Sequence, residues 1–125
     1  MESADSDLFD TTDVERSASE FAVDPAALTE RLADHQAAVE ELPGVENIVY
    51  EWRKQYEDPL IERTAEVYYL RVPATVWDEY GDALGVSDAM LGALVDVHRR
   101  TVSTASAVSP TPPDGVAYVA LDRTL

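Results

Sequence analysis

The stretch "YGDALGVSDAMLGALVDVHRR", residues Tyr80 to Arg100, decides the fold because it joins two apolar helical stripes through a single glycine. Apolar residues up to Leu84 predict a short amphipathic helix that ends at Gly85, where a left-handed turn suits glycine. Ser87 can cap a second, longer helix by accepting a hydrogen bond from its first turn. The buried stripe of this second helix is predicted to consist of Leu91, Leu94, Val95, His98 and Val102.

Another helix is predicted before this corner, over residues 25 to about 42. Asp24 followed by Pro25 is a strong helix start, because the aspartate can accept from free backbone N–H groups and proline is preset to a helical φ. Pro43 and Gly44 are expected to end the helix. Its apolar stripe is predicted to contain Leu28, Leu32, His35, Val39 and Leu42.

Two segments between these helices have the character of strands. In "VENIVYEWRKQY", residues 45–56, Ile48, Tyr50 and Trp52 alternate with polar residues, which is typical of a half-buried strand. "AEVYYLRVP", residues 65–73, is rich in β-forming residues and closes with a proline. The pair predicts an antiparallel hairpin, and the connecting "EDPLIERT" is expected to be its loop.

The remaining segments complete the expected fold. Residues 1–20 are acidic and poor in apolar anchors, which predicts a disordered tail in which Leu8 and Phe9 are either a short docking motif or a chance pair. Residues 103–115 read as a Ser/Thr/Pro linker before a carboxy-terminal strand, "VAYVALD". We therefore predict a single domain over residues 21–125. Its class is α+β, with a three-stranded, mostly antiparallel sheet, about three helices on one face and the order α-β-β-α-α-β.

The composition limits the habitat and the chemistry. The 125 residues include 25 acidic and 9 basic side chains, giving a formal charge of -16. This surplus of acid, together with arginine in place of lysine everywhere except Lys54, resembles proteins of salt-accumulating haloarchaea, and implies a cytoplasm at molar salt. The absence of cysteine excludes disulfides and thiol chemistry. Because no apolar run approaches the length of a membrane span, we expect a cytoplasmic protein that does not contact membranes.

The corner from Tyr80 to Arg100 resembles the helix-turn-helix of bacterial and archaeal regulators. The resemblance rests on Tyr80, Gly81, Leu84, Gly85, Val86, Leu91 and Leu94. It implies DNA binding, with Ser87, Arg99 and Arg100 as the contacts. A reading helix usually offers arginine or amide side chains near its start, whereas this one offers Asp88, Ala89, Gly92 and Ala93. Arg99 and Arg100 can also stabilise the negative, carboxyl end of the helix dipole. The competing interpretation is therefore a purely structural corner.

Basic and aromatic residues interleave in the predicted hairpin, which makes it the candidate interaction surface. Exposed aromatics on a sheet can stack on nucleic-acid bases, but the same pattern is typical of a sheet face covered by helices. Acidic side chains outnumber basic ones even here, so a protein partner or a second copy is expected before nucleic acid. The candidate residues are Tyr50, Trp52, Arg53, Lys54, Tyr56, Leu60, Ile61, Arg63, Tyr69 and Arg71.

The sequence gives little support to catalysis. His35 and His98 both fall within apolar helical stripes, where they are either hydrogen-bonded core residues or an acid–base or metal-binding pair. No third ligand stands beside either at a suitable spacing except carboxylates such as Asp34, so no metal and no cofactor are expected. Our leading hypothesis is a non-catalytic interaction or regulatory module. The alternative is a helix-turn-helix regulator of transcription.

Overall fold

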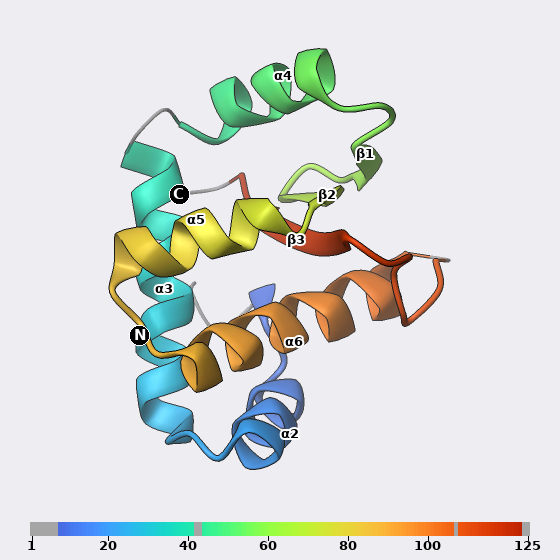
Figure 1. Cartoon of the computed structure of the whole chain (residues 1–125). Helices are drawn as coiled ribbons and strands as arrows, with labels where there is room; N and C mark the ends of the chain where they lie inside the picture. The colour runs from blue at the N-terminus through green and yellow to red at the C-terminus, as the bar shows by residue number, and fades with distance from the viewer. Residues whose placement is uncertain (1–7, 42–43, 107, 124–125) are drawn as a thin grey trace.

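The computed structural model describes residues 8–41, 44–106 and 108–123, and these form an α+β fold with one antiparallel sheet (Figure 1). Three helices come first, then a hairpin, then two helices and a last strand. In chain order the elements are α2 (Thr11–Phe21), α3 (Pro25–Glu41), α4 (Val45–Gln55), β1 (Leu60–Arg63), β2 (Val67–Pro73), α5 (Thr75–Leu84), α6 (Asp88–Ala105) and β3 (Val116–Asp122).

The capping signals in the sequence are confirmed. The Ala27 N–H donates to the carboxylate of Asp24 at 2.9 Å, ahead of α3, and the Met90 N–H donates to the Ser87 hydroxyl at 3.1 Å, ahead of α6. Gly85 ends α5 in a left-handed conformation with φ 68°. The two helices of the corner therefore begin and end where the local chemistry predicts, although α6 continues to Ala105, into the predicted linker.

Residues 45–55 form helix α4, so the strand predicted over 45–56 is wrong. Val45, Val49 and Trp52 are buried and lie three and four residues apart, which is the spacing of one helical face. Arg53 and Lys54 lie in the last turn, where cations favour the negative end of the helix dipole. The alternation of Ile48, Tyr50 and Trp52 that suggested a strand coexists with this helical pattern, and packing selects the helix.

The hairpin is built from β1 and β2, and β1 occupies what the sequence predicted to be the loop. Leu60 pairs with Leu70 and Arg63 with Tyr68, with an irregular register between Leu60 and Glu62. The turn is tight because the hydroxyl of Thr64 accepts the N–H of Val67 at 3.0 Å. The order of strands is β1-β2-β3, and both pairings are antiparallel. The sheet lies between α4 and α6 in Figure 1.

The predicted disordered tail is helical from Thr11 onward, as α2, while residues 1–7 lie outside the described residues. Val14 and Ala18 are buried in the core, and Ser17 is fully buried as well. Asp10 caps the helix by accepting the Thr12 N–H at 2.7 Å. The sequence did not reveal this helix because one of its three buried side chains is a serine, whose partner lies 79 residues further along the chain. Leu42 and Pro43, the predicted end of α3, also lie outside the described residues.

Side chains close the outer edge of β3. The Gln36 amide of α3 donates to the Ala120 carbonyl and accepts the Asp122 N–H, both at 2.8 Å. His98 of α6 accepts the Ala120 N–H at 2.9 Å, and the indole of Trp77 in α5 donates to the Tyr118 carbonyl at 3.1 Å. Three helices thus satisfy backbone groups that a further strand would otherwise pair with.

Among the described residues, no helix combines the length and the apolar character that crossing a membrane requires.

Candidate functional site

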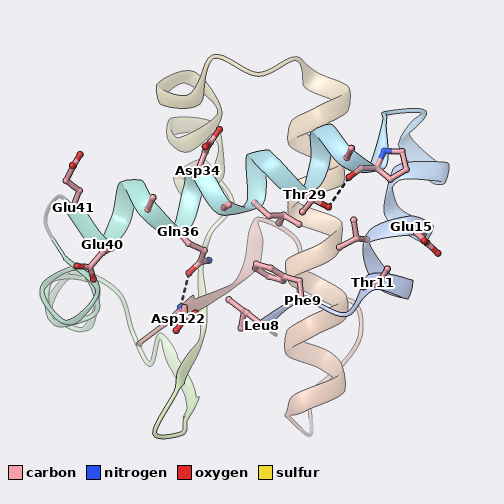
Figure 2. A pocket seen from close by; sticks show the side chains of 16 residues that line it. Leu8, Phe9, Thr11, Glu15, Thr29, Asp34, Gln36, Glu40, Glu41 and Asp122 are labelled. Carbon is pink, nitrogen blue, oxygen red and sulfur yellow. Dashed lines mark hydrogen bonds between the residues drawn. The ribbon is translucent and has the colours of Figure 1, made fainter. Parts of the chain in front are cut away.

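A groove of about 860 Å³ runs along one side of α3. Figure 2 shows the helix on one side and Leu8 and Phe9 on the other, with Glu15 near one end and Glu40 and Glu41 at the opposite end. The lining residues are Leu8, Phe9, Thr11, Val14, Glu15, Pro25, Ala26, Thr29, Leu32, Ala33, Asp34, Gln36, Ala37, Glu40, Glu41 and Asp122.

Helix α3 gives the groove its length. Pro25, Thr29 and Ala33 recur at a spacing of four residues, and Ala37 and Glu41 continue the same face to the end of the helix. With 17 residues at a rise of about 1.5 Å each, this face extends over about 25 Å. Small side chains along it leave an open channel instead of a filled helix surface.

The floor of the groove is apolar and belongs to the core. Phe9, Val14 and Leu32 line it and are 6%, 7% and 2% exposed. Leu8 is half-buried and packs against the same core. The groove is therefore an apolar channel, and a ligand that filled it would remove apolar surface from water.

The rim of the groove is acidic. The exposed Glu15, Asp34, Glu40 and Glu41 lie there, and the buried Asp122 also lines the groove. Within the described lining there is no lysine or arginine. The rim therefore favours cationic ligands and repels anionic ones.

Gln36 connects the groove to the sheet. It lines the groove, yet both ends of its amide are held by β3 backbone groups, as the dashed contact to Asp122 in Figure 2 shows for one of them. This fixed side chain keeps α3 at a constant distance from the sheet edge.

A cluster of aromatic rings lies inside the core next to the groove. Phe9 contacts the ring of His98, with ring centroids 4.8 Å apart, and His98 lies 5.3 Å from His35. Trp77 and Tyr80 complete the cluster around His35 at 4.7 and 4.4 Å. Both histidines are 0% exposed. The structure thus brings together the two histidines that the sequence singled out.

The environment of this cluster keeps both histidines neutral. Burial lowers the pKa of His35 from 6.5 to about 3, and burial together with the neighbouring His35 lowers the pKa of His98 well below its usual value. Nδ1 of His98 accepts the Ala120 N–H, which places its proton on Nε2. Nε2 of His98 and both ring nitrogens of His35 have no hydrogen-bond partner among the described residues.

Among the described residues the histidine pair has no third ligand, and both rings are fully buried. Across the residues that the structure describes, no group of three or more His, Asp and Glu side chains could hold a metal ion. Neither histidine lines the α3 groove. The geometry supports a packing role for the histidines in the core.

The residues predicted to contact DNA are engaged in the fold. Ser87 caps α6, as predicted. Arg99 donates to Oδ1 of Asp96 from Nε at 3.0 Å and from Nη2 at 2.7 Å, and Arg100 donates to Oδ2 from Nε at 2.9 Å. Arg100 also binds Glu20 of α2 at 2.7 Å. The expectation that both arginines serve the end of the helix dipole is wrong, because α6 continues to Ala105 and its last turn holds no basic residue.

Asp88 and Ala89 at the start of α6 are exposed, and close packing covers one side of the helix from Leu91 onward. A side chain at Gly92 would meet the ring of Phe21 at 2.5 Å, and one at Gly81 would meet Leu91 at 2.9 Å. Ala93 and Leu94 are fully buried. The helix that would have to enter a DNA groove is thus covered on this side by α2 and α5.

The residues of the predicted hairpin surface are divided between helix α4 with its C-cap and the two strands β1 and β2. Trp52 is 4% exposed and is therefore a core residue and not a contact residue. Tyr69 and Arg71 alternate along β2 with the buried Tyr68 and Leu70, and so lie on the opposite face of the strand. Tyr50 stands out at 63% exposure. Of the other candidates, Arg53, Lys54, Arg63 and Arg71 are exposed and Tyr56, Leu60, Ile61 and Tyr69 are half-buried.

The groove was not predicted from the sequence. Its floor combines residues 8 to 14 with one face of α3, and that face is marked only by small residues such as Ala26, Ala33 and Ala37. The available signal was the pair Leu8 and Phe9, which stands out as apolar within an acidic segment.

A comparison with protein-family models matches residues 7–120 to a domain of unknown function, DUF8048. No curated protein and no solved structure matches the chain.

Proposed function

We propose that this chain, which belongs to the DUF8048 family of domains of unknown function, is a non-catalytic protein-interaction module that docks a helical segment of another protein in the α3 groove. The observation that carries the proposal is the groove itself, a channel that follows α3 and has the apolar side chains of Phe9, Val14 and Leu32 as its floor. Grooves of this kind receive the apolar face of an amphipathic helix.

The shape of the groove favours a helix over other ligands. Its volume would also suit a small molecule, but its length of about 25 Å corresponds to roughly 17 residues of a helix lying parallel to α3. A partner strand has no place here, because Gln36, His98 and Trp77 already bond the outer edge of β3. Small side chains at Ala33 and Ala37 would let a second helix approach closely.

The groove has more support as a docking site than the two surfaces suggested by the sequence. The exposed cations of the predicted hairpin surface belong to different elements, Arg53 and Lys54 to helix α4 and Arg63 and Arg71 to the strands. Asp96 holds the arginines of the α5–α6 corner. A DNA-reading role would need those arginines free to reach phosphates or bases.

The same proposal places the protein in the cytoplasm of a salt-adapted cell. A formal charge of -16 would destabilise a compact chain by self-repulsion in dilute solution. At molar salt the screening length falls to about 3 Å, so this repulsion is weak and apolar docking becomes the stronger contribution to binding.

Affinity purification with two matched variants tests the proposal. The bait is the tagged full-length chain, and the extract comes from the source cells at molar salt after nuclease treatment. Ala37→Arg places a long cation inside the groove, whereas Ala38→Arg places it at an exposed position of α3 that does not line the groove. We expect the partner recovered by the unmodified chain to be lost with Ala37→Arg and kept with Ala38→Arg.

Equal recovery by the two variants would exclude the groove as the docking site. A partner that disappears after nuclease treatment would instead support nucleic-acid binding.

A further inference from the structure

We infer that the segment received by the groove is a cationic amphipathic helix, with basic side chains at both ends of an apolar stretch of about four turns. This inference rests on the proposed function and adds the chemistry of the partner. It follows from where the exposed carboxylates lie along the groove.

Acidic side chains that form no ion pair with any described residue mark both ends of the groove. Glu15 lies near the start of α3, and Glu40 and Glu41 lie at its end (Figure 2). All three are exposed, and none forms an ion pair with a described residue. Asp34, which also lines the groove, is already paired with Arg31 at 2.9 Å.

The middle of the groove is complementary to apolar side chains of a ligand. Phe9, Val14 and Leu32 form the floor there, and Ala33 and Ala37 form the facing side of α3. A charged group placed on this floor would lose water without gaining a partner. The groove is acidic at both ends and apolar in the middle. It is therefore complementary to a helix that has basic side chains at both ends and an apolar face between them.

Two other occupants fit this charge pattern poorly. A second copy that presented the same groove would bring its carboxylates against these, because a two-fold interface places identical patches together. A fatty acid would place its carboxylate among the acidic side chains of the rim. A basic helix instead neutralises both ends while its apolar face covers the floor.

Peptide binding to the full-length chain tests the inference. The probes are three fluorescently labelled 18-residue peptides: a leucine/lysine amphipathic helix, a scrambled form of the same composition, and a leucine/glutamate helix. Anisotropy titrations at 0.5 M and 2 M KCl, with circular dichroism showing the folded chain at each salt, give the dissociation constants. We expect saturable one-to-one binding of the leucine/lysine helix, with the other two peptides at least tenfold weaker.

Matched charge variants separate the rim from the overall charge of the chain. Glu15→Gln/Glu40→Gln removes one carboxylate from each end of the groove, whereas Glu57→Gln/Asp82→Asn removes two exposed carboxylates elsewhere. We expect the first pair to raise the dissociation constant of the leucine/lysine helix about threefold to tenfold at 0.5 M KCl. The increase should be smaller at 2 M KCl, because salt screens exposed charges. The second pair should change binding less than twofold.

Three results would overturn the inference. They are equal effects of the two variant pairs, equal binding of the leucine/glutamate helix, and a dimer of the unliganded chain in sedimentation that Ala37→Arg abolishes. If the natural partner is still lost with Ala37→Arg while the rim variants bind it normally, the proposed docking site stands and the cationic partner is wrong. If Ala37→Arg leaves both the partner and the peptide bound, the proposed function itself fails.

Discussion

Lowering the pH from 7.5 to 5 is expected to cost the folded chain about 2 kcal/mol through His35 alone. The pKa of His35 is lowered from 6.5 to about 3 by burial, so at pH 5 the unfolded chain binds a proton that the folded chain does not. This contribution to stability is complete above pH 6.5 and is lost as the pH falls from 6.5 towards 3. His98, whose pKa is also lowered by burial and by His35, adds a loss of the same sign.

The variant His35→Phe isolates this contribution from the many carboxylates of the chain. Its ring can pack against Trp77 and Tyr80 as the imidazole does, and no hydrogen bond to a described residue is lost. Denaturant unfolding of both proteins at pH 7.5 and pH 5, in the same molar salt, measures the difference. We expect the loss of stability between the two pH values to be about 2 kcal/mol smaller in the variant. An identical loss in both proteins would show that His35 is accessible to protons in the folded state.

Replacement of Asp96 by asparagine is expected to destabilise the chain by about 3 kcal/mol. The carboxylate is 8% exposed and accepts hydrogen bonds from Arg99, Arg100 and the fully buried Ser17, so it joins α6 to α2. Burial alone would raise the pKa of Asp96, but the hydrogen bonds from Arg100, Arg99 and Ser17 outweigh it and hold the pKa below its usual value. Removing the negative charge leaves two partly buried guanidinium groups without their counter-ion.

Asp88→Asn is the control, because Asp88 is exposed in the first turn of the same helix. There the change removes only a favourable interaction with the helix dipole, of at most about 1 kcal/mol. Chemical denaturation at pH 7.5 and molar salt gives both values. Similar small losses for the two variants would mean that the Asp96 network contributes little and that the α2–α6 contact depends on its apolar residues.

The parts of the fold that were predictable are those with local causes. Gly85, Ser87 and Asp24 act within one turn of their own helices, and the α5–α6 corner and the start of α3 were therefore predicted correctly. Strands β2 and β3 were predictable because their β-forming residues are contiguous. In each case the residues that determine the structure are neighbours in the chain.

The errors have long-range causes. In residues 45–55 an alternating pattern and a helical pattern share Trp52, and only packing of Val45 and Val49 decides between them. Helix α2 buries the polar side chain of Ser17. This is possible because the Ser17 hydroxyl donates a hydrogen bond to the carboxylate of Asp96 at 2.8 Å. No property of residues 1–20 taken alone indicates that partner.

The candidate site was unpredictable for a similar reason. The groove forms where Leu8 and Phe9 meet the small residues of α3, and it becomes a channel because those alanines leave space. The buried stripe of α3 can be recognised in the sequence from its large apolar residues. Ala33 and Ala37, which line the groove, have no comparable sequence signal.

The most direct test of the central claim is to map by nuclear magnetic resonance which backbone amides respond when the leucine/lysine helix is added to the isotopically labelled chain. We predict that the shifted amides follow the groove, from Leu8 to Glu15 and along α3 from Ala26 to Glu41, with Ala37→Arg suppressing the shifts. Shifts confined to α4 and the hairpin, or to the exposed side of the α5–α6 corner, would contradict the account.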